Sequence, residues 1–100
     1  MIAQVLRQAE AYLEECLTKG AAARKYAVSL GTVEYSGHLA QKMMDFSSKM
    51  ESTYKKLRPL VSDKCEQYSK YKKYFDLLSE KFAWFTSAEA SFLKKVSPFV

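Results

Sequence analysis

Glycine and proline are scarce in this chain, which has three glycines and two prolines among its 100 residues. Folds built mainly from β-strands need many tight turns, and tight turns are where these two residue types gather. Hydrophobic residues make up 48% of the chain, so its composition is not that of a disordered protein. The length fits one domain. The sequence therefore predicts a single all-α domain over residues 1–100.

Cysteine and histidine are also rare. Cys16 and Cys65 lie far apart and form no CxxC pattern, and His38 is the only histidine in the sequence. A zinc site needs several such ligands close together, and nucleophilic catalysis needs a nucleophile beside a base. No glycine-rich phosphate loop is present either. We therefore expect a protein that is not an enzyme and binds no cofactor or metal. The two cysteines are compatible with one disulfide, but two buried free thiols in a reducing cytosol are the favoured interpretation.

Long apolar runs are missing as well. No stretch approaches the roughly 20 residues that a membrane-spanning helix needs. The first residues, Met1-Ile2-Ala3-Gln4, lack the basic and apolar regions of a secretory signal peptide. The sequence therefore predicts a cytoplasmic protein without a transmembrane segment. If it is secreted, its export does not use a cleavable signal peptide.

Apolar residues recur at helical spacing along most of the chain. One amphipathic helix is predicted over residues 2–30, followed by a turn over residues 31–37 that contains Gly31 and Gly37. Gly20 lies on the apolar stripe of that helix, where it either allows the close approach of a facing helix or weakens or kinks the helix. A second stripe runs from Leu39 to Phe85 with a mean step of about 3.5 residues, the coiled-coil period.

Pro59 interrupts this second pattern, because proline lacks a backbone donor and clashes with the preceding helical turn. Two structures are compatible with it. In the first, an antiparallel helical hairpin has a long second helix that is kinked or broken at Pro59. In the second, one helix covers residues 38–58 and Pro59 begins another over residues 59–96, which gives a three-helix bundle.

Large apolar side chains concentrate in the last third of the chain, and rings at 82, 84, 85 and 92 cannot all face one narrow core. Trp84 and Phe92 are therefore candidates for an exposed apolar patch, although a three-helix packing would bury both. The residues predicted to bind a protein partner are Phe75, Leu78, Phe82, Trp84 and Phe92.

The chain is basic, with a net charge of +5 and an isoelectric point of about 9.2. Lysines and tyrosines alternate between Lys64 and Lys73, a mixture that can line a nucleic-acid surface. Lysine-rich faces of helical bundles have the same composition, and the chain has only Arg7, Arg24 and Arg58 as arginines. A solvated helical face is therefore the favoured interpretation, and nucleic acid is the less favoured partner.

Two short sequence motifs occur in the predicted turn and in the last predicted helix. The predicted turn contains Tyr35-Ser36-Gly37, and the last helix contains Phe85-Thr86-Ser87-Ala88-Glu89. The first resembles the W-x-G turn motif, with tyrosine in place of tryptophan, and the second resembles an aromatic-x-x-x-acid export signal. Together they make the chain similar to the W-x-G superfamily of type VII secretion, in particular to the targeting proteins that accompany L-x-G toxins in Gram-positive bacteria.

This resemblance implies a role and a set of partners. The chain would pair, in a homo- or heterodimer, with a helical protein such as the N-terminal domain of an L-x-G toxin or a related small helical protein. Phe85 and Glu89 would be read by a secretion ATPase, so that Phe85→Ala or Glu89→Ala would abolish secretion and leave the fold and partner binding intact. Tyr35 and Gly37 would form the turn motif.

Two other functions fit the same residues. The chain is also compatible with a cytosolic immunity or antitoxin-like helical bundle, which would neutralise a toxin without being exported. A coiled-coil subunit of a larger assembly, touching anionic membrane through its lysines, is the third alternative.

Overall fold

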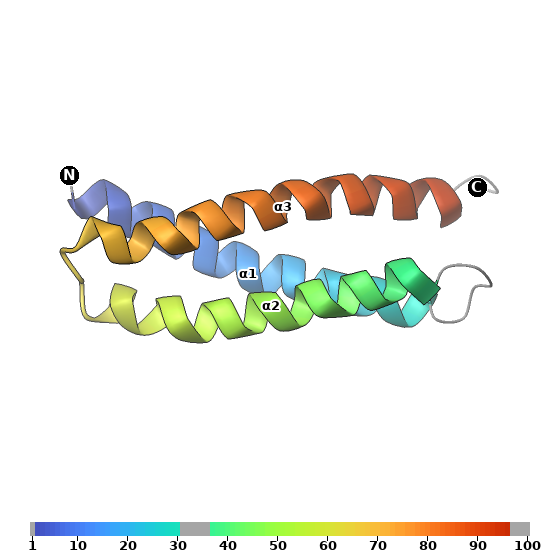
Figure 1. The fold of residues 1–100 in the computed structure, drawn as a ribbon, viewed down its shortest axis with the longest axis horizontal. Coiled ribbons are helices and arrows are strands. Elements are labelled where there is room, and N and C mark those ends of the chain that lie inside the picture. The colour runs from blue at the N-terminus through green and yellow to red at the C-terminus, as the bar shows by residue number, and fades with distance from the viewer. Residues whose placement is uncertain (1, 31–36, 97–100) are drawn as a thin grey trace.

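Three α-helices make up the computed structural model, which describes residues 2–30 and 37–96 (Figure 1). Helix α1 spans Ile2–Leu30, α2 spans Gly37–Ser62 and α3 spans Tyr68–Val96. No strand occurs in these two segments. The prediction of an all-α chain is thus confirmed for the part that the structure describes.

The helices lie lengthwise beside one another in a rod of 49 × 21 × 16 Å (Figure 1). Helices α1 and α3 run in the same direction and α2 runs against them, so the chain goes up, down and up along the rod. Each helix contacts both of the others. Among the described helices, none is long and apolar enough to cross a membrane.

Helix α2 does not end at Pro59. It continues to Ser62, so the alternative in which one helix ends at residue 58 and the next begins at Pro59 is wrong, and the break lies at residues 63–67. The third helix accordingly begins at Tyr68 and not at residue 59. A proline near the end of a helix loses one backbone hydrogen bond, and Asp63 closes the turn that follows by donating its N–H to the Pro59 carbonyl at 2.9 Å.

The end of α2 is fixed by the backbone at Lys64. This residue has a φ of 50°, in the left-handed region that reverses a helical chain. Its N–H donates to the Val61 carbonyl at 3.1 Å, and the N–H of Cys65 donates to the Leu60 carbonyl at 3.0 Å. These two bonds form a Schellman motif, a common helix end that usually has glycine where Lys64 stands. Sequence reasoning missed this boundary because a lysine gives no sign of it.

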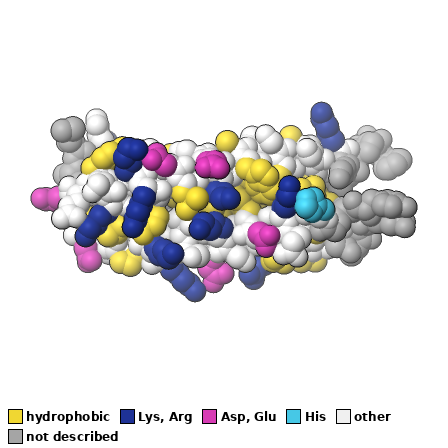
Figure 2. Space-filling view, viewed as in Figure 1, with side chains coloured by type: hydrophobic (Ala, Val, Ile, Leu, Met, Phe, Trp, Pro, Cys, Tyr) yellow, Lys and Arg dark blue, Asp and Glu magenta, His cyan; other side chains and the backbone are white. Residues whose placement is uncertain are grey.

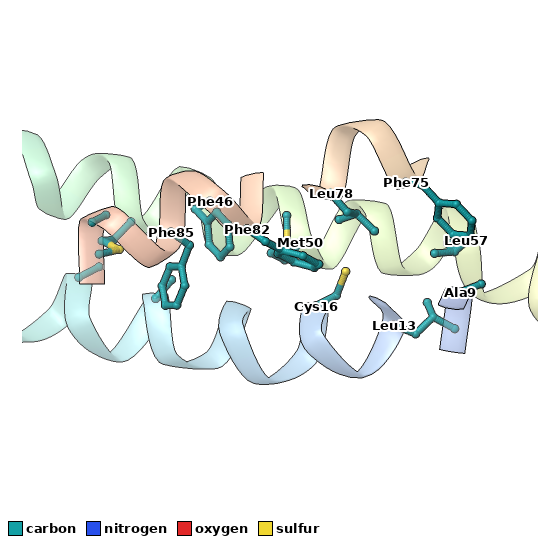
Figure 3. Packing of buried hydrophobic residues seen from close by; sticks show 14 of the residues in the cluster. Ala9, Leu13, Cys16, Phe46, Met50, Leu57, Phe75, Leu78, Phe82 and Phe85 are labelled. Carbon is teal, nitrogen blue, oxygen red and sulfur yellow. The ribbon is translucent and has the colours of Figure 1, made fainter. Parts of the chain in front are cut away.

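The three helices contribute side chains of different size to one core (Figure 3). Helix α1 supplies small residues such as Ala9, Ala23 and Ala27, while α3 supplies mostly large rings. A Cβ atom added at Gly20 would lie 3.2 Å from the Cβ of Met50 on α2. The expected close approach of a facing helix at Gly20 is thus confirmed, and that helix is α2.

Candidate functional site

Phe85, the aromatic residue of the predicted export signal, lies in the core. Its side chain is only 3% exposed. Its ring stacks on Phe46 of α2, with ring centroids 4.8 Å apart, and on Tyr26 of α1 at 6.2 Å. Figure 3 shows Phe85 and Phe46 side by side between the helices. In this conformation the ring is covered by both neighbouring helices and is not displayed to a partner.

Glu89, the acid of the same motif, is half-buried and also faces α1. The hydroxyl of Tyr26 donates a hydrogen bond of 2.6 Å to the Glu89 carboxylate. This bond to Glu89, with burial as a smaller cause, raises the pKa of Tyr26 above its usual value. Phe85 and Glu89 therefore share a helical face, as their spacing predicts, but Tyr26 closes that face.

Four of the five residues predicted to bind a partner are also buried in the core: Phe75, Leu78, Phe82 and Phe92 are 5%, 0%, 9% and 6% exposed. The expectation that Phe92 belongs to an exposed patch is wrong. Phe92 stacks on Tyr26 with ring centroids 4.4 Å apart. Phe75 and Phe82 meet the ring of Tyr12 edge to face at 5.2 and 5.6 Å. Two tyrosines of α1 thus cover the aromatic face of α3.

Trp84 differs from the other four because its side chain remains half-buried. Its ring packs on Phe46 with centroids 5.6 Å apart. Together these two rings line a hollow between α2 and α3, whose other lining residues are Lys42, Asp45, Lys49 and Lys81. Figure 2 shows basic side chains around exposed apolar surface on the face that these two helices present to the viewer. We refer to these six residues as the Trp84 hollow.

The predicted turn motif falls mostly outside the described residues. Tyr35 lies in the segment that the structure leaves out, and Gly37 is the first residue of α2. The role of this motif stays a prediction.

A second candidate surface, which the sequence analysis missed, runs along α1. Six residues spaced alternately four and three apart are all exposed, and we refer to them as the α1 stripe: Glu10, Glu14, Leu17, Ala21, Arg24 and Val28. Leu17 is 55% exposed and Val28 is 64% exposed, and they lie on the same face of α1 as exposed Ala21. The sequence did not indicate this surface, because the polar residues of the α1 stripe resemble an ordinary solvent-exposed side of an amphipathic helix.

The α1 stripe borders a shallow groove between α1 and α2. Leu17 of α1 and Tyr54 of α2 both line the two parts of this groove. At one end the groove is lined by Glu10, Glu14 and Arg58. Toward the other end it is lined by residues that include Gly20, Ala21, Arg24, Met50 and Glu51. The arrangement is a narrow apolar floor with charged residues along its edges.

The described part contains two free thiols, Cys16, which is buried, and Cys65, which is half-buried, and one histidine. The thiol of Cys16 is buried in the core, and this burial, with a smaller effect from the charge of Glu15, raises its pKa to about 11. Cys16 is therefore a protonated thiol at neutral pH. His38 is exposed near the start of α2. Residues 2–30 and 37–96 contain no group of three or more His, Cys, Asp or Glu side chains that could hold a metal ion.

Comparison with known proteins gives no relative: no protein-family model, no curated protein and no solved structure matches this chain.

Proposed function

We propose that this chain is a helix-pairing protein, a three-helix bundle that binds a helix of a partner along the α1 stripe, and that it is not an enzyme. The observation that carries the proposal is the stripe itself, in which exposed Leu17 and Val28 lie on one line with unpaired charges. An exposed apolar line bordered by charge is the usual form of a surface that receives another helix.

The order of charges along the stripe specifies the direction of that helix. Glu10 and Glu14 lie toward the start of α1, and Arg24 lies toward its end. Neither Glu14 nor Arg24 forms an ion pair within the described residues. A helix with the same charge order, running antiparallel, would therefore place an acid opposite Arg24 and a base opposite Glu14.

A second copy of this chain has that charge order, so it is the partner with which pairing can be tested directly. When two copies of α1 run antiparallel about a two-fold axis level with residue 19, Glu14 faces Arg24 of the second copy. Leu17 then faces Ala21 of that copy, and Val28 faces the stem of Glu10. Such a contact repeats itself on both sides of the axis, as in most protein dimers.

Charge reversal tests this pairing. Each of Glu14→Arg and Arg24→Glu places two like-charged pairs in the interface, so each variant is expected to dissociate about tenfold more readily than the original chain. A mixture of the two variants restores both opposite-charge pairs and is expected to recover the original affinity as a heterodimer. The measurement is molar mass by light scattering or analytical ultracentrifugation over a range of concentrations.

Lys94→Glu, on the exposed surface of α3, is the matched control and is expected to leave the assembly unchanged. An original chain that stays monomeric at all concentrations, or a mixture that associates no better than the single variants, would contradict pairing through the α1 stripe of a second copy.

We further propose that the pairing serves type VII secretion. The support is the motif resemblance: Phe85 and Glu89 have the spacing of the export signal and lie on one face of α3. The partner would be a toxin N-terminal domain or a sibling helical protein, and a secretion ATPase would read the signal. Because Tyr26 covers this face in the folded chain, α3 would have to separate from α1 before the signal is read.

The export role is tested with Glu89→Gln in a bacterium that exports the original chain. Glutamine keeps the shape and can still accept the hydrogen bond of Tyr26, so the variant should stay folded and lose only the charge. Export is expected to be abolished, as measured by the fraction of the chain in the culture medium. Glu80→Gln, an exposed acid on the same helix, is the control. Export of both variants at the original level would refute the signal.

A further inference from the structure

The Trp84 hollow is not explained by pairing along the α1 stripe. The hollow lies between α2 and α3, whereas the α1 stripe borders the groove between α1 and α2. The hollow combines a half-buried tryptophan with three lysines from two helices. Tryptophan is enriched where a surface becomes buried by a partner, because its ring offers a large apolar area and a polar N–H. The Trp84 hollow is therefore a candidate surface for a second partner.

The lysines of the hollow continue along α2 at a regular interval. Lys42 and Lys49 line the hollow, and Lys56 follows seven residues later on the same helical face. Seven residues are two helical turns, so these three side chains form a row about 21 Å long. Lys81 of α3 flanks the row. A row with this repeat matches a straight helix that presents carboxylates every two turns.

The charges of this row are not neutralised within the chain. None of Lys42, Lys49, Lys56 and Lys81 forms an ion pair in the described segments. The one acid in the hollow, Asp45, accepts a hydrogen bond of 2.9 Å from Gln41 on its own helix. Positive charge that is left unpaired beside a half-buried aromatic ring favours an acidic partner.

We propose that the Trp84 hollow is a second interaction site, which binds an acidic amphipathic helix of another protein. Carboxylates of that helix pair with the lysine row, and one of its large apolar side chains covers Trp84. Phosphate backbones fit less well, since Asp45 lies in the hollow and no arginine lines it. A membrane surface also fits less well, because Trp84 is the only large apolar residue that lines the hollow and remains partly exposed.

The test uses Trp84 as its own reporter, because it is the only tryptophan in the chain. The probe is a synthetic helical peptide of about three heptads, with glutamate repeating every seventh residue beside an apolar stripe. A second peptide carries glutamine in place of glutamate. The acidic peptide is expected to shift the emission of Trp84 to shorter wavelength and to bind more weakly as salt is added. The glutamine peptide is expected to leave the emission unchanged.

Variants then locate the binding. Replacing Lys42, Lys49 and Lys81 together by glutamine is expected to weaken binding of the acidic peptide about tenfold. The reason is that three exposed charge pairs are lost, and each contributes roughly a factor of two to the affinity. The control variant replaces Arg7, Lys25 and Lys94 by glutamine, which removes the same charge elsewhere. Circular dichroism of both variants checks that they remain helical.

Three outcomes would overturn the proposal. One is an equal loss of affinity in the control variant, which would mean attraction by net charge alone. Another is no change in Trp84 emission on adding the acidic peptide. The last is tighter binding of a single-stranded oligonucleotide or of anionic phospholipid vesicles than of the peptide, which would assign the hollow to those partners. None of these outcomes bears on pairing along the α1 stripe, which is measured with other variants.

Discussion

Replacing Phe85 by alanine is expected to lower the free energy of unfolding by about 3–5 kcal/mol, the range found when a buried phenylalanine is truncated. The ring is 3% exposed and stacks on rings from both other helices. Its removal would leave a cavity beside the rings of Phe46 and Tyr26. Urea unfolding followed by circular dichroism measures the change.

Tyr68→Ala is the matched control for this prediction. It removes an aromatic ring of the same helix that is 53% exposed, and it is expected to cost less than about 1 kcal/mol. If both variants unfolded at the same urea concentration, Phe85 would not occupy the core position that the structure assigns to it.

The result matters for any study of export. The resemblance to an export signal predicts that Phe85→Ala abolishes secretion and leaves the fold intact. Because the Phe85 side chain is buried to this extent, its truncation is expected to destabilise the fold and not to leave it intact. Loss of secretion in Phe85→Ala would therefore follow from unfolding as readily as from loss of a signal. Glu89→Gln separates the two causes, because it changes a half-buried charge and leaves the core untouched.

Local sequence rules were sufficient for some elements. The apolar spacing and Gly31 predicted a helix over residues 2–30, which is the span of α1. They were insufficient at the end of α2, where Pro59 is the conspicuous residue and Lys64 is the one with the left-handed backbone. That boundary depends on hydrogen bonds between backbone groups, which most residue types can make.

The orientation of the helices was equally hidden from the sequence. Spacing correctly put Phe85 and Glu89 on one face of a helix, but it does not say what that face meets. Tyr26, which lies 59 residues before Phe85 in the chain, packs on this face and covers it. The partner of the small residues of α1 was hidden in the same way, since Gly20 lies against Met50 of α2.

The two candidate surfaces lie in grooves on different pairs of helices. The α1 stripe carries both signs of charge and suits a partner with the same order of charges, whereas the Trp84 hollow is basic and suits an acidic one. A chain with two such surfaces can hold two helices at once. If both proposals hold, the function is that of an adaptor that brings an acidic helical segment to a paired helical protein.

Tyr71 is expected to be the residue on which the corner between α2 and α3 depends most. It is fully buried, and its hydroxyl donates a hydrogen bond of 3.0 Å to the carbonyl of Leu60, just after Pro59. The same carbonyl accepts the N–H of Cys65, so one oxygen ties the end of α2 to both the connecting segment and α3. The ring also stacks against Phe75 with centroids 6.0 Å apart.

Two substitutions separate the ring of Tyr71 from its hydroxyl. Tyr71→Ala is expected to destabilise the fold by about 3–5 kcal/mol, because it removes a fully buried ring. Tyr71→Phe is expected to cost about 1 kcal/mol, because the carbonyl of Leu60 keeps its bond to Cys65 and is not left unpaired. Urea unfolding of both variants measures the two effects. Equal losses in the two variants would mean that the hydrogen bond, and not the packing of the ring, secures the corner.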